Sequence, residues 1–149
     1  MLVNFLFKNC RSFYQENIFS MQAVKDTELR EINTFTVDSK LMPKDENEFI
    51  KSAVIFGGNA SGKSNVLKAL AYMKNVLLMS ASQFPIVAAN ETFAFYENAQ
   101  NEESTYEVEI IHNASYYKYG FTLLKGIVKS EWLEPVSYTH LTLPTNSRV

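Results

Sequence analysis

A glycine-rich phosphate-binding pattern lies near the middle of the chain, and only a few folds accommodate it. Residues 57–65 read GGNASGKSN and match the pattern G-x-x-x-x-G-K-[ST]. Small residues let such a loop turn its N–H groups toward an anion, Lys63 can reach the outer phosphates of a nucleotide, and Ser64 can ligate Mg²⁺. The candidate cofactor-binding residues are Gly57, Gly58, Asn59, Ala60, Ser61, Gly62, Lys63, Ser64 and Asn65, with Ser64 also the candidate metal ligand.

The segments on either side of the loop agree with this interpretation. Residues 53–56 read AVIF, which is typical of a short buried parallel strand. A helix running to about Met79 is predicted by apolar residues at helical spacing, namely Val66, Leu67, Leu70, Met73, Val76 and Leu77. Strand, loop and helix in this order are what the pattern requires. The alternative, a chance match in a loop rich in Gly and Ser, explains neither neighbour.

The last 14 residues are expected to be foreign to the protein. Residues 136–145 read VSYTHLTLPT, which resembles one reading frame of the transposon-end adaptor used in sequencing libraries. A genuine β-rich tail is the alternative. Such added segments are excluded from fold reasoning, so we expect residues 1–135 to be the N-terminal part of a longer ATPase domain and residues 136–149 to be a non-native tail.

Composition excludes several classes of function. A formal net charge of −2 argues against a strongly basic nucleic-acid surface in this segment. Cys10 is the only cysteine, so an intramolecular disulfide or a cysteine-rich zinc site is excluded. We expect Cys10 to be a buried small apolar residue in a strand-like context rather than a nucleophile. With no signal peptide and no long apolar run, a cytoplasmic location without membrane contact is expected.

Antiparallel strands are predicted on both sides of the phosphate-binding loop. Residues 2–8 and 17–24 read as two strands joined through a turn at residues 9–13, and residues 38–52 read as a polar surface loop. Residues 80–85 should end the helix, because the residue before Pro85 is disfavoured in helical conformation.

A meander of three strands is predicted after a polar loop at residues 97–104. Tyr106, Val108 and Ile110 alternate with Glu107, Glu109 and Ile111 along the first strand. Turns at residues 112–115 and 125–126 separate it from a second strand carrying Tyr117, Tyr119 and Phe121, and from a third at residues 127–133.

Two features of the meander invite functional hypotheses. The tyrosines of residues 116–119 could stack on bases, but aromatic residues also favour half-buried strands, and we expect sheet packing. His112 stands in a turn without a neighbouring His or Cys, which argues against a metal or catalytic role.

Three blocks of the sequence together resemble one group of ATPases. Residues 9–13 (NCRSF), after the LVNF start, resemble the opening NFRSF signature of RecF-like and SMC-like ATPases, with Cys10 in place of the usual aromatic residue. Residues 56–70 resemble the nucleotide loop of these proteins. The block from residues 117–121 through 130–133 resembles the abortive-infection branch of AAA ATPases, related to the OLD-type proteins.

The resemblance implies an α/β P-loop NTPase, specifically the N-terminal part of an ABC-type ATPase head carrying an antiparallel β meander. It implies ATP and Mg²⁺ as cofactors, a head-to-tail homodimer of heads, and a role in phage defence or DNA processing, with any nucleic-acid contact made by other regions. It also assigns Arg11 to the nucleotide site, although a solvated turn residue is an equally good interpretation. Such heads need a carboxylate-ended strand for hydrolysis, yet no aspartate follows Asp45 and no Ser-Gly-Gly signature occurs.

Three functional hypotheses therefore stay open. The first is an ATPase head whose full-length parent hydrolyses ATP. The second is a module whose dimerisation or docking is gated by nucleotide without turnover. The third is a non-functional truncated piece with no independent fold, because the central strands of its sheet would be missing. Its unpaired edge strands would favour aggregation.

Overall fold

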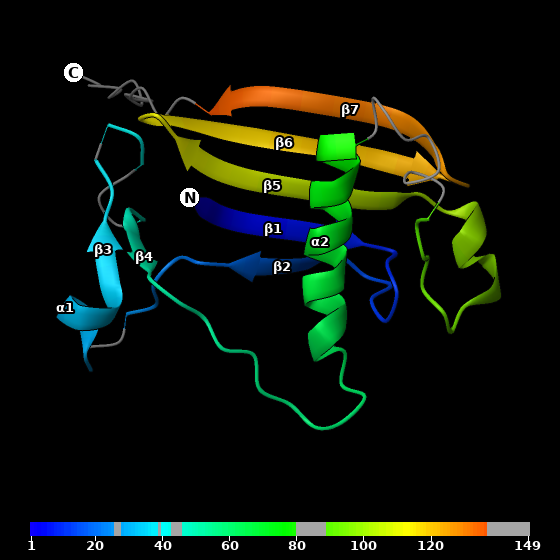
Figure 1. Ribbon diagram of the computed structural model, residues 1–149, viewed down its shortest axis with the longest axis horizontal. Coiled ribbons are helices and arrows are strands. Elements are labelled where there is room, and N and C mark those ends of the chain that lie inside the picture. The colour runs from blue at the N-terminus through cyan, green and yellow to red at the C-terminus, as the bar shows by residue number, and fades with distance from the viewer. Residues whose placement is uncertain (26–27, 39, 43–45, 80–88, 137–149) are drawn as a thin grey trace, which may run out of the picture.

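An antiparallel sheet crossed on one face by a long helix forms the main body of the described chain (Figure 1). The computed structural model describes residues 1–25, 28–38, 40–42, 46–79 and 89–136. The elements are β1 (Leu2–Lys8), β2 (Asn17–Ser20), α1 (Arg30–Asn33), β3 (Thr34–Thr36), β4 (Glu48–Ile50), α2 (Lys63–Met79), η1 (Glu97–Asn101), β5 (Ser104–His112), β6 (Ser115–Leu124) and β7 (Ile127–Val136).

The main sheet has the strand order β2-β1-β5-β6-β7, with every neighbouring pair antiparallel. The opening strand β1 therefore lies inside the sheet, between β2 and β5, although about a hundred residues separate it in sequence from β5. The predicted hairpin and the predicted meander are both confirmed, and they join into one sheet through the β1–β5 pairing. The fold is thus mixed α/β with an antiparallel sheet.

The turns of the meander follow from local backbone chemistry. Asn113 and Ala114 both have positive φ values, 48° and 54°, as do Lys125 and Gly126 at 51° and 73°. Two successive residues with positive φ twist the chain in the sense that joins antiparallel strands tightly. Both turns lie where the sequence predicts them.

The larger core is packed between α2 and the sheet face that the helix crosses (Figure 1). From the sheet come alternate residues of β1, β5 and β6, and from α2 come three buried residues one turn apart. The buried members are Phe5, Phe7, Cys10, Ala69, Met73, Val76, Tyr106, Val108, Phe121 and Leu123. Period-two burial on the strands against helical spacing on α2 is what makes these two faces meet.

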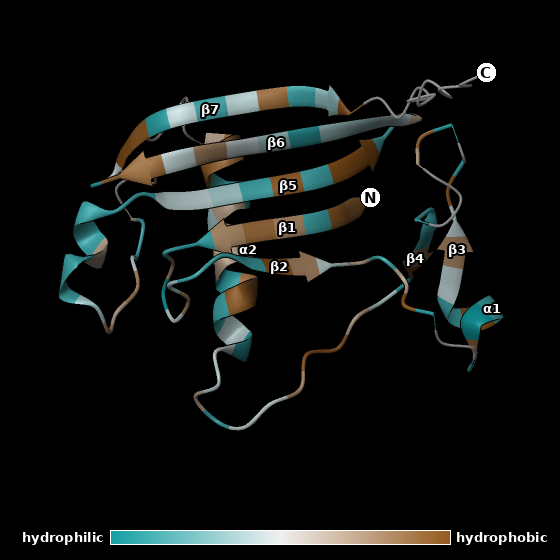
Figure 2. Ribbon diagram, turned by 180° about the vertical axis from the view of Figure 1, so that it is seen from behind, coloured by the Kyte–Doolittle hydropathy of each residue, from teal (hydrophilic) through white to brown (hydrophobic). Residues whose placement is uncertain are grey.

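A smaller core lies beside the β3–β4 hairpin, next to one end of the main sheet (Figure 2). It contains Val3, Met42, Phe49 and Tyr116 as buried residues. Arg30 and Glu48 join α1 to β4 through a salt bridge, and Thr34 donates to the same carboxylate at 2.6 Å. These elements correct the sequence prediction, because residues 48–50 form a strand within the predicted loop and α1 with β3 was not expected.

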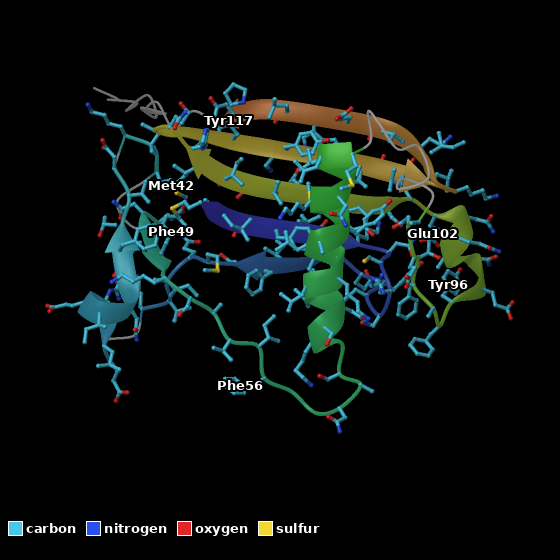
Figure 3. All side chains as sticks on the ribbon, viewed as in Figure 1. Met42, Phe49, Phe56, Tyr96, Glu102 and Tyr117 are labelled. Atoms are coloured by element: carbon cyan, nitrogen blue, oxygen red, sulfur yellow. The ribbon has the colours of Figure 1, made fainter. Side chains whose placement is uncertain are left out.

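The segment preceding the phosphate-binding loop is a clear departure from the prediction. Residues 53–56 form no strand, and Val54 and Phe56 are 72% and 88% exposed. Figure 3 shows Phe56 on the connection between β4 and α2. An apolar run of this kind becomes a buried parallel strand only when other strands flank it and cover both faces. None of the described strands lies alongside this segment in a sheet, so the local pattern alone does not bury it.

Other boundaries also shift. Leu67 and Leu77 of the predicted apolar helix face are exposed, whereas Met73 and Val76 are buried as predicted. The predicted strand at residues 17–24 ends at Ser20, and the predicted loop at residues 97–104 contains the short helix η1. Strand β7 continues to Val136, the first residue of the predicted foreign tail. The predicted helix break at residues 80–85 and the rest of that tail lie outside the described residues. Among the described helices, none has the length and apolar character needed to cross a membrane.

Candidate phosphate-binding site

The loop at residues 57–62 leads directly into α2, as the sequence predicts. Ala60 and Gly62 adopt positive φ values of 61° and 91°. The N–H groups of Asn65 and Val66 donate to the Gly62 carbonyl at 2.8 and 3.3 Å, so the first turn of the helix closes on the loop itself. The first N–H groups of a helix have no intrahelical partners and carry the positive end of its dipole. The helix start is therefore aimed at the space where an anion would bind.

Lys63 folds back over the loop that precedes it. Its ammonium group donates to the backbone carbonyls of Gly57 and Gly58 at 2.8 and 2.6 Å. These contacts hold a positive charge beside the loop rather than out in solvent. A phosphate oxygen entering the loop would be within range of the same ammonium group.

At two glycines of the loop, Gly57 and Gly62, an added side chain would come too close to a neighbouring serine hydroxyl. A Cβ on Gly57 would lie 2.6 Å from the Ser61 hydroxyl oxygen. A Cβ on Gly62 would lie 2.9 Å from the Ser12 hydroxyl oxygen, and its φ of +91° is strained for any other residue. The loop thus folds tightly on itself and against the turn that follows β1.

That turn, residues 9–13, contacts the phosphate-binding loop directly. The side-chain amide of Asn65 donates to the Ser12 hydroxyl at 3.0 Å, and the Phe13 ring lies against Gly62. Arg11, at the tip of the turn, has a φ of 52°. The turn therefore fixes where Arg11 stands relative to the start of α2.

The same turn holds a second segment, residues 91–95, which we call the pocket-wall segment. The Arg11 N–H donates to the Glu91 carbonyl at 2.9 Å, and the Ala94 N–H donates to the Arg11 carbonyl at 3.0 Å. The Arg11 guanidinium also forms a two-pronged ion pair with the Glu91 carboxylate, both contacts at 2.9 Å. Backbone and side chain together tie Arg11 to this segment.

The buried side chain of Asn9 holds the pocket-wall segment in place through hydrogen bonds. It is fully buried, its amide group donates to the carbonyls of Ala99 and Glu102 at 2.7 and 3.0 Å, and its oxygen accepts the Phe93 N–H at 3.1 Å. The Asn9 carbonyl accepts the Ser104 hydroxyl at 2.7 Å. One buried side chain thus joins the turn after β1 to the backbone on both sides of η1.

The turn at residues 9–13, the phosphate-binding loop and the pocket-wall segment together line an open hollow of about 440 Å³. Its lining comes from the turn, the loop with the start of α2, and the pocket-wall segment, namely Arg11, Ser12, Ala60, Ser61, Gly62, Lys63, Ser64, Asn65, Glu91, Thr92, Ala94 and Phe95. Arg11 and the predicted residues 60–65 are therefore brought together around one space. Gly57, Gly58 and Asn59 lie in the same loop outside this lining.

Sequence reasoning missed Asn9, Glu91 and Phe95. Asn9 was noted only as part of the opening block, and a buried asparagine at positive φ cannot be distinguished by sequence from an ordinary turn residue. Glu91 and Phe95 are about eighty residues from Arg11, and no motif links them to it. Backbone hydrogen bonds between Arg11 and residues 91–94 bring them together, next to the β1–β5 pairing.

Cys10 is buried within the turn, as predicted, although it forms an isolated bridge with Phe13 instead of lying in a strand. Burial raises the pKa of its thiol, and the neighbouring Tyr106 hydroxyl only partly offsets this by hydrogen bonding. Burial raises the pKa of Tyr106 as well. No group of three potential metal-binding side chains occurs among the described residues, and His112 is exposed at the end of β5.

The tyrosines of β6 make contacts within the sheet. The buried Tyr116 donates to Glu109 at 2.7 Å, and Tyr119 donates to Glu131 at 2.8 Å while packing against Phe121. These contacts support the sheet-packing interpretation over base stacking for this cluster.

Comparison with known proteins yields one family. Residues 52–145 match the model of the family described as "AAA domain, putative AbiEii toxin, Type IV TA system". No curated protein matches the chain. The match includes the phosphate-binding loop, α2, the pocket-wall segment and the meander.

Proposed function

Because the chain belongs to this family of AAA domains, we propose that it binds ATP with Mg²⁺ in the hollow between the phosphate-binding loop and the pocket-wall segment. The observation that carries the proposal is the conformation of residues 57–65, whose turned backbone, lysine and helix start converge on one side of that hollow.

Each residue has a role that its chemistry permits. Loop N–H groups and the start of α2 would bind phosphate oxygens, and the Lys63 ammonium would exchange its carbonyl partners for charged ones, which form stronger hydrogen bonds. The Ser64 hydroxyl, which lines the hollow, would hold Mg²⁺. Arg11 would add a positive charge opposite the loop, shared with Glu91.

We further propose that the full-length parent is an ABC-type head that hydrolyses ATP as a head-to-tail dimer, in abortive infection, toxin–antitoxin function or DNA processing. The resemblance of residues 9–13 and 56–70 to RecF-like and SMC-like ATPases, and of the meander to OLD-related ones, supports this. The absence of aspartate after Asp45 predicts that residues 1–149 alone show no ATPase activity above background. Turnover by this chain that disappears in Lys63→Ala would contradict that expectation.

The decisive experiment is calorimetric titration of the chain with ATP in the presence of Mg²⁺. Wild type should bind, and Lys63→Ala should lower the affinity at least about tenfold, since one charge-assisted contact to phosphate is worth about 1.5–3 kcal/mol. Lys129→Ala is the matched control, because it removes one exposed positive charge from β7, outside the hollow. Equal affinities in wild type and Lys63→Ala would show that this loop is not the site.

A nucleotide-gated interaction module is the second candidate, and the exposed apolar residues Val54, Phe56 and Leu67 favour it. They lie just before the loop and on the first turns of α2, so a partner covering them would contact elements that bind nucleotide. ATP-dependent dimerisation without turnover, measured by sedimentation, would support this candidate over the ATPase.

A further inference from the structure

One aromatic side chain lines the hollow without being buried by the protein. Phe95 is 84% exposed and lines the same hollow as the loop residues 60–65. Exposing a phenylalanine ring to this extent forgoes the stabilisation that burial of its apolar surface would give. An exposed ring on the wall of a polar hollow has the character of a stacking surface.

The Phe95 ring also contacts a neighbouring aromatic side chain. Its ring contacts the Phe93 ring edge-on, with centroids 5.7 Å apart, and Phe93 lies 5.5 Å from the Tyr14 ring. The Tyr14 hydroxyl donates to the Glu102 carboxylate at 2.9 Å. Figure 3 shows Tyr96 and Glu102 on this side of the molecule, beside the turn after β1.

The backbone leading to Phe95 is fixed at two successive residues. The Phe93 N–H donates to the buried side chain of Asn9, and the Ala94 N–H donates to the Arg11 carbonyl. Little conformational freedom of the adjoining backbone would be lost on stacking, and such preorganisation increases affinity. The exposure of the ring is therefore built into the fold by Asn9 and Arg11.

The hollow has room for more than phosphates. Its volume of about 440 Å³ falls within the range typical of sites for nucleotide-sized ligands. Its loop side supplies N–H groups, a lysine and a hydroxyl, whereas the pocket-wall segment supplies Glu91, Thr92, Ala94 and the ring of Phe95. Polar donors on one side and an aromatic surface on the other match the two ends of a nucleoside triphosphate.

We propose that Phe95 is the stacking surface for the base of the bound nucleoside triphosphate, and that Asn9 and Arg11 position it. This inference rests on the proposed ATP site. A ring stacks on the face of any base, so Phe95 contributes affinity for the nucleoside part without choosing between adenine and guanine.

The test compares ATP with inorganic tripolyphosphate, which carries the phosphates without a base. Both are titrated with Mg²⁺ into wild type, Phe95→Ala and Phe95→Trp. Base stacking predicts that Phe95→Ala lowers ATP affinity by about five- to 150-fold and leaves tripolyphosphate affinity unchanged. Phe95→Trp should retain ATP affinity. Leu133→Ala, an exposed apolar residue of β7 outside the hollow, should alter neither affinity.

The outcomes separate the stacking inference from the proposed function. If wild type binds both probes with equal affinity, or if Phe95→Ala weakens both equally, the base does not stack on Phe95 although the phosphate site stands. If wild type binds neither probe, the proposed function fails and the stacking inference falls with it. Because Phe95 is so exposed, Phe95→Ala should unfold at the same temperature as wild type, which thermal melting checks.

Discussion

Asn9 has the largest structural role of any single polar side chain near the site. It satisfies two carbonyls and one N–H from segments more than eighty residues away. The Ala99 carbonyl also accepts the Glu102 N–H at 3.2 Å, so Asn9→Ala would remove the side-chain partner of two half-buried groups, the Glu102 carbonyl and the Phe93 N–H. Each such group left unpaired costs about 1–3 kcal/mol. We expect a loss of at least about 2 kcal/mol in the free energy of unfolding, measured by urea denaturation.

The chain offers a matched control for that variant. Asn113 has the same φ of 48° as Asn9 but is exposed in the turn between β5 and β6. Asn113→Ala therefore carries the same backbone strain without the buried hydrogen bonds. A cost equal to that of Asn9→Ala would refute the role assigned to the Asn9 side chain.

The rate at which the Cys10 thiol reacts with a reagent shows whether the turn at residues 9–13 stays closed. The thiolate is the reactive form, and burial both raises the thiol pKa and blocks access. We expect iodoacetamide at pH 8 to modify the native chain at least about tenfold more slowly than the urea-unfolded chain. Mass spectrometry reads this without ambiguity, because the chain has one cysteine. Equal rates would mean that the turn opens freely.

Strands β6 and β7 contact each other closely at the cross-strand pair of Gly120 and Trp132. Trp132 lies over Gly120, and a Cβ on Gly120 would stand 2.3 Å from the indole ring, whose N–H donates to Glu107 at 2.9 Å. Gly120→Ala would push the indole off its site, and overpacking of this kind costs about 1–3 kcal/mol. The free energy of unfolding should fall accordingly.

A double-mutant cycle tests whether the indole is the cause. In a Trp132→Ala background the obstacle is gone, so adding Gly120→Ala should cost much less than it does in wild type. Additive costs measured by urea denaturation would place the strain elsewhere, for instance in the backbone of β6.

The elements predicted correctly are those whose pattern is set by local chemistry. Strand β1 alternates between buried and less buried residues along its length, β5 does so over its first six residues, and α2 follows a glycine-rich loop. The burial of β6 is less regular, but predicted turns bound this strand at both ends. The three-residue strands β3 and β4 are too short to show a period, and they depend on Arg30–Glu48 pairing across 18 residues. Residues 53–56 carry a strand pattern, but a parallel strand needs neighbours that no local pattern supplies.

The candidate site, like the fold, was predictable from the sequence only in part. The phosphate-binding loop was predictable because eight consecutive residues, 57–64, carry the motif, and the structure shows its turned backbone and the start of α2. The wall formed by residues 91–95 was not predictable, because this segment is placed by hydrogen bonds to Asn9 and Arg11 about eighty residues away in sequence.

For the molecule as a whole, the exposed apolar residues of the segment 53–56 are the main feature that favours aggregation. Val54 and Phe56 present apolar side chains on an extended backbone outside any sheet, which favours association between chains. Val54→Lys should reduce aggregation, measured by light scattering at raised protein concentration, without lowering the unfolding temperature. Ile127→Lys, which also replaces an exposed apolar residue by lysine but in β7, is the control and should reduce aggregation less.

The position of β1 inside the sheet has a consequence for synthesis on the ribosome. Leu2 pairs with Ile110, so at about 5–20 residues per second the opening strand waits roughly 5–20 s for its neighbour to be translated. The phosphate-binding loop emerges well before residues 91–95 and β5, which complete its surroundings. A nascent chain halted before residue 90 would therefore expose the loop with one wall missing, and the pocket is among the last parts of this fold to be assembled.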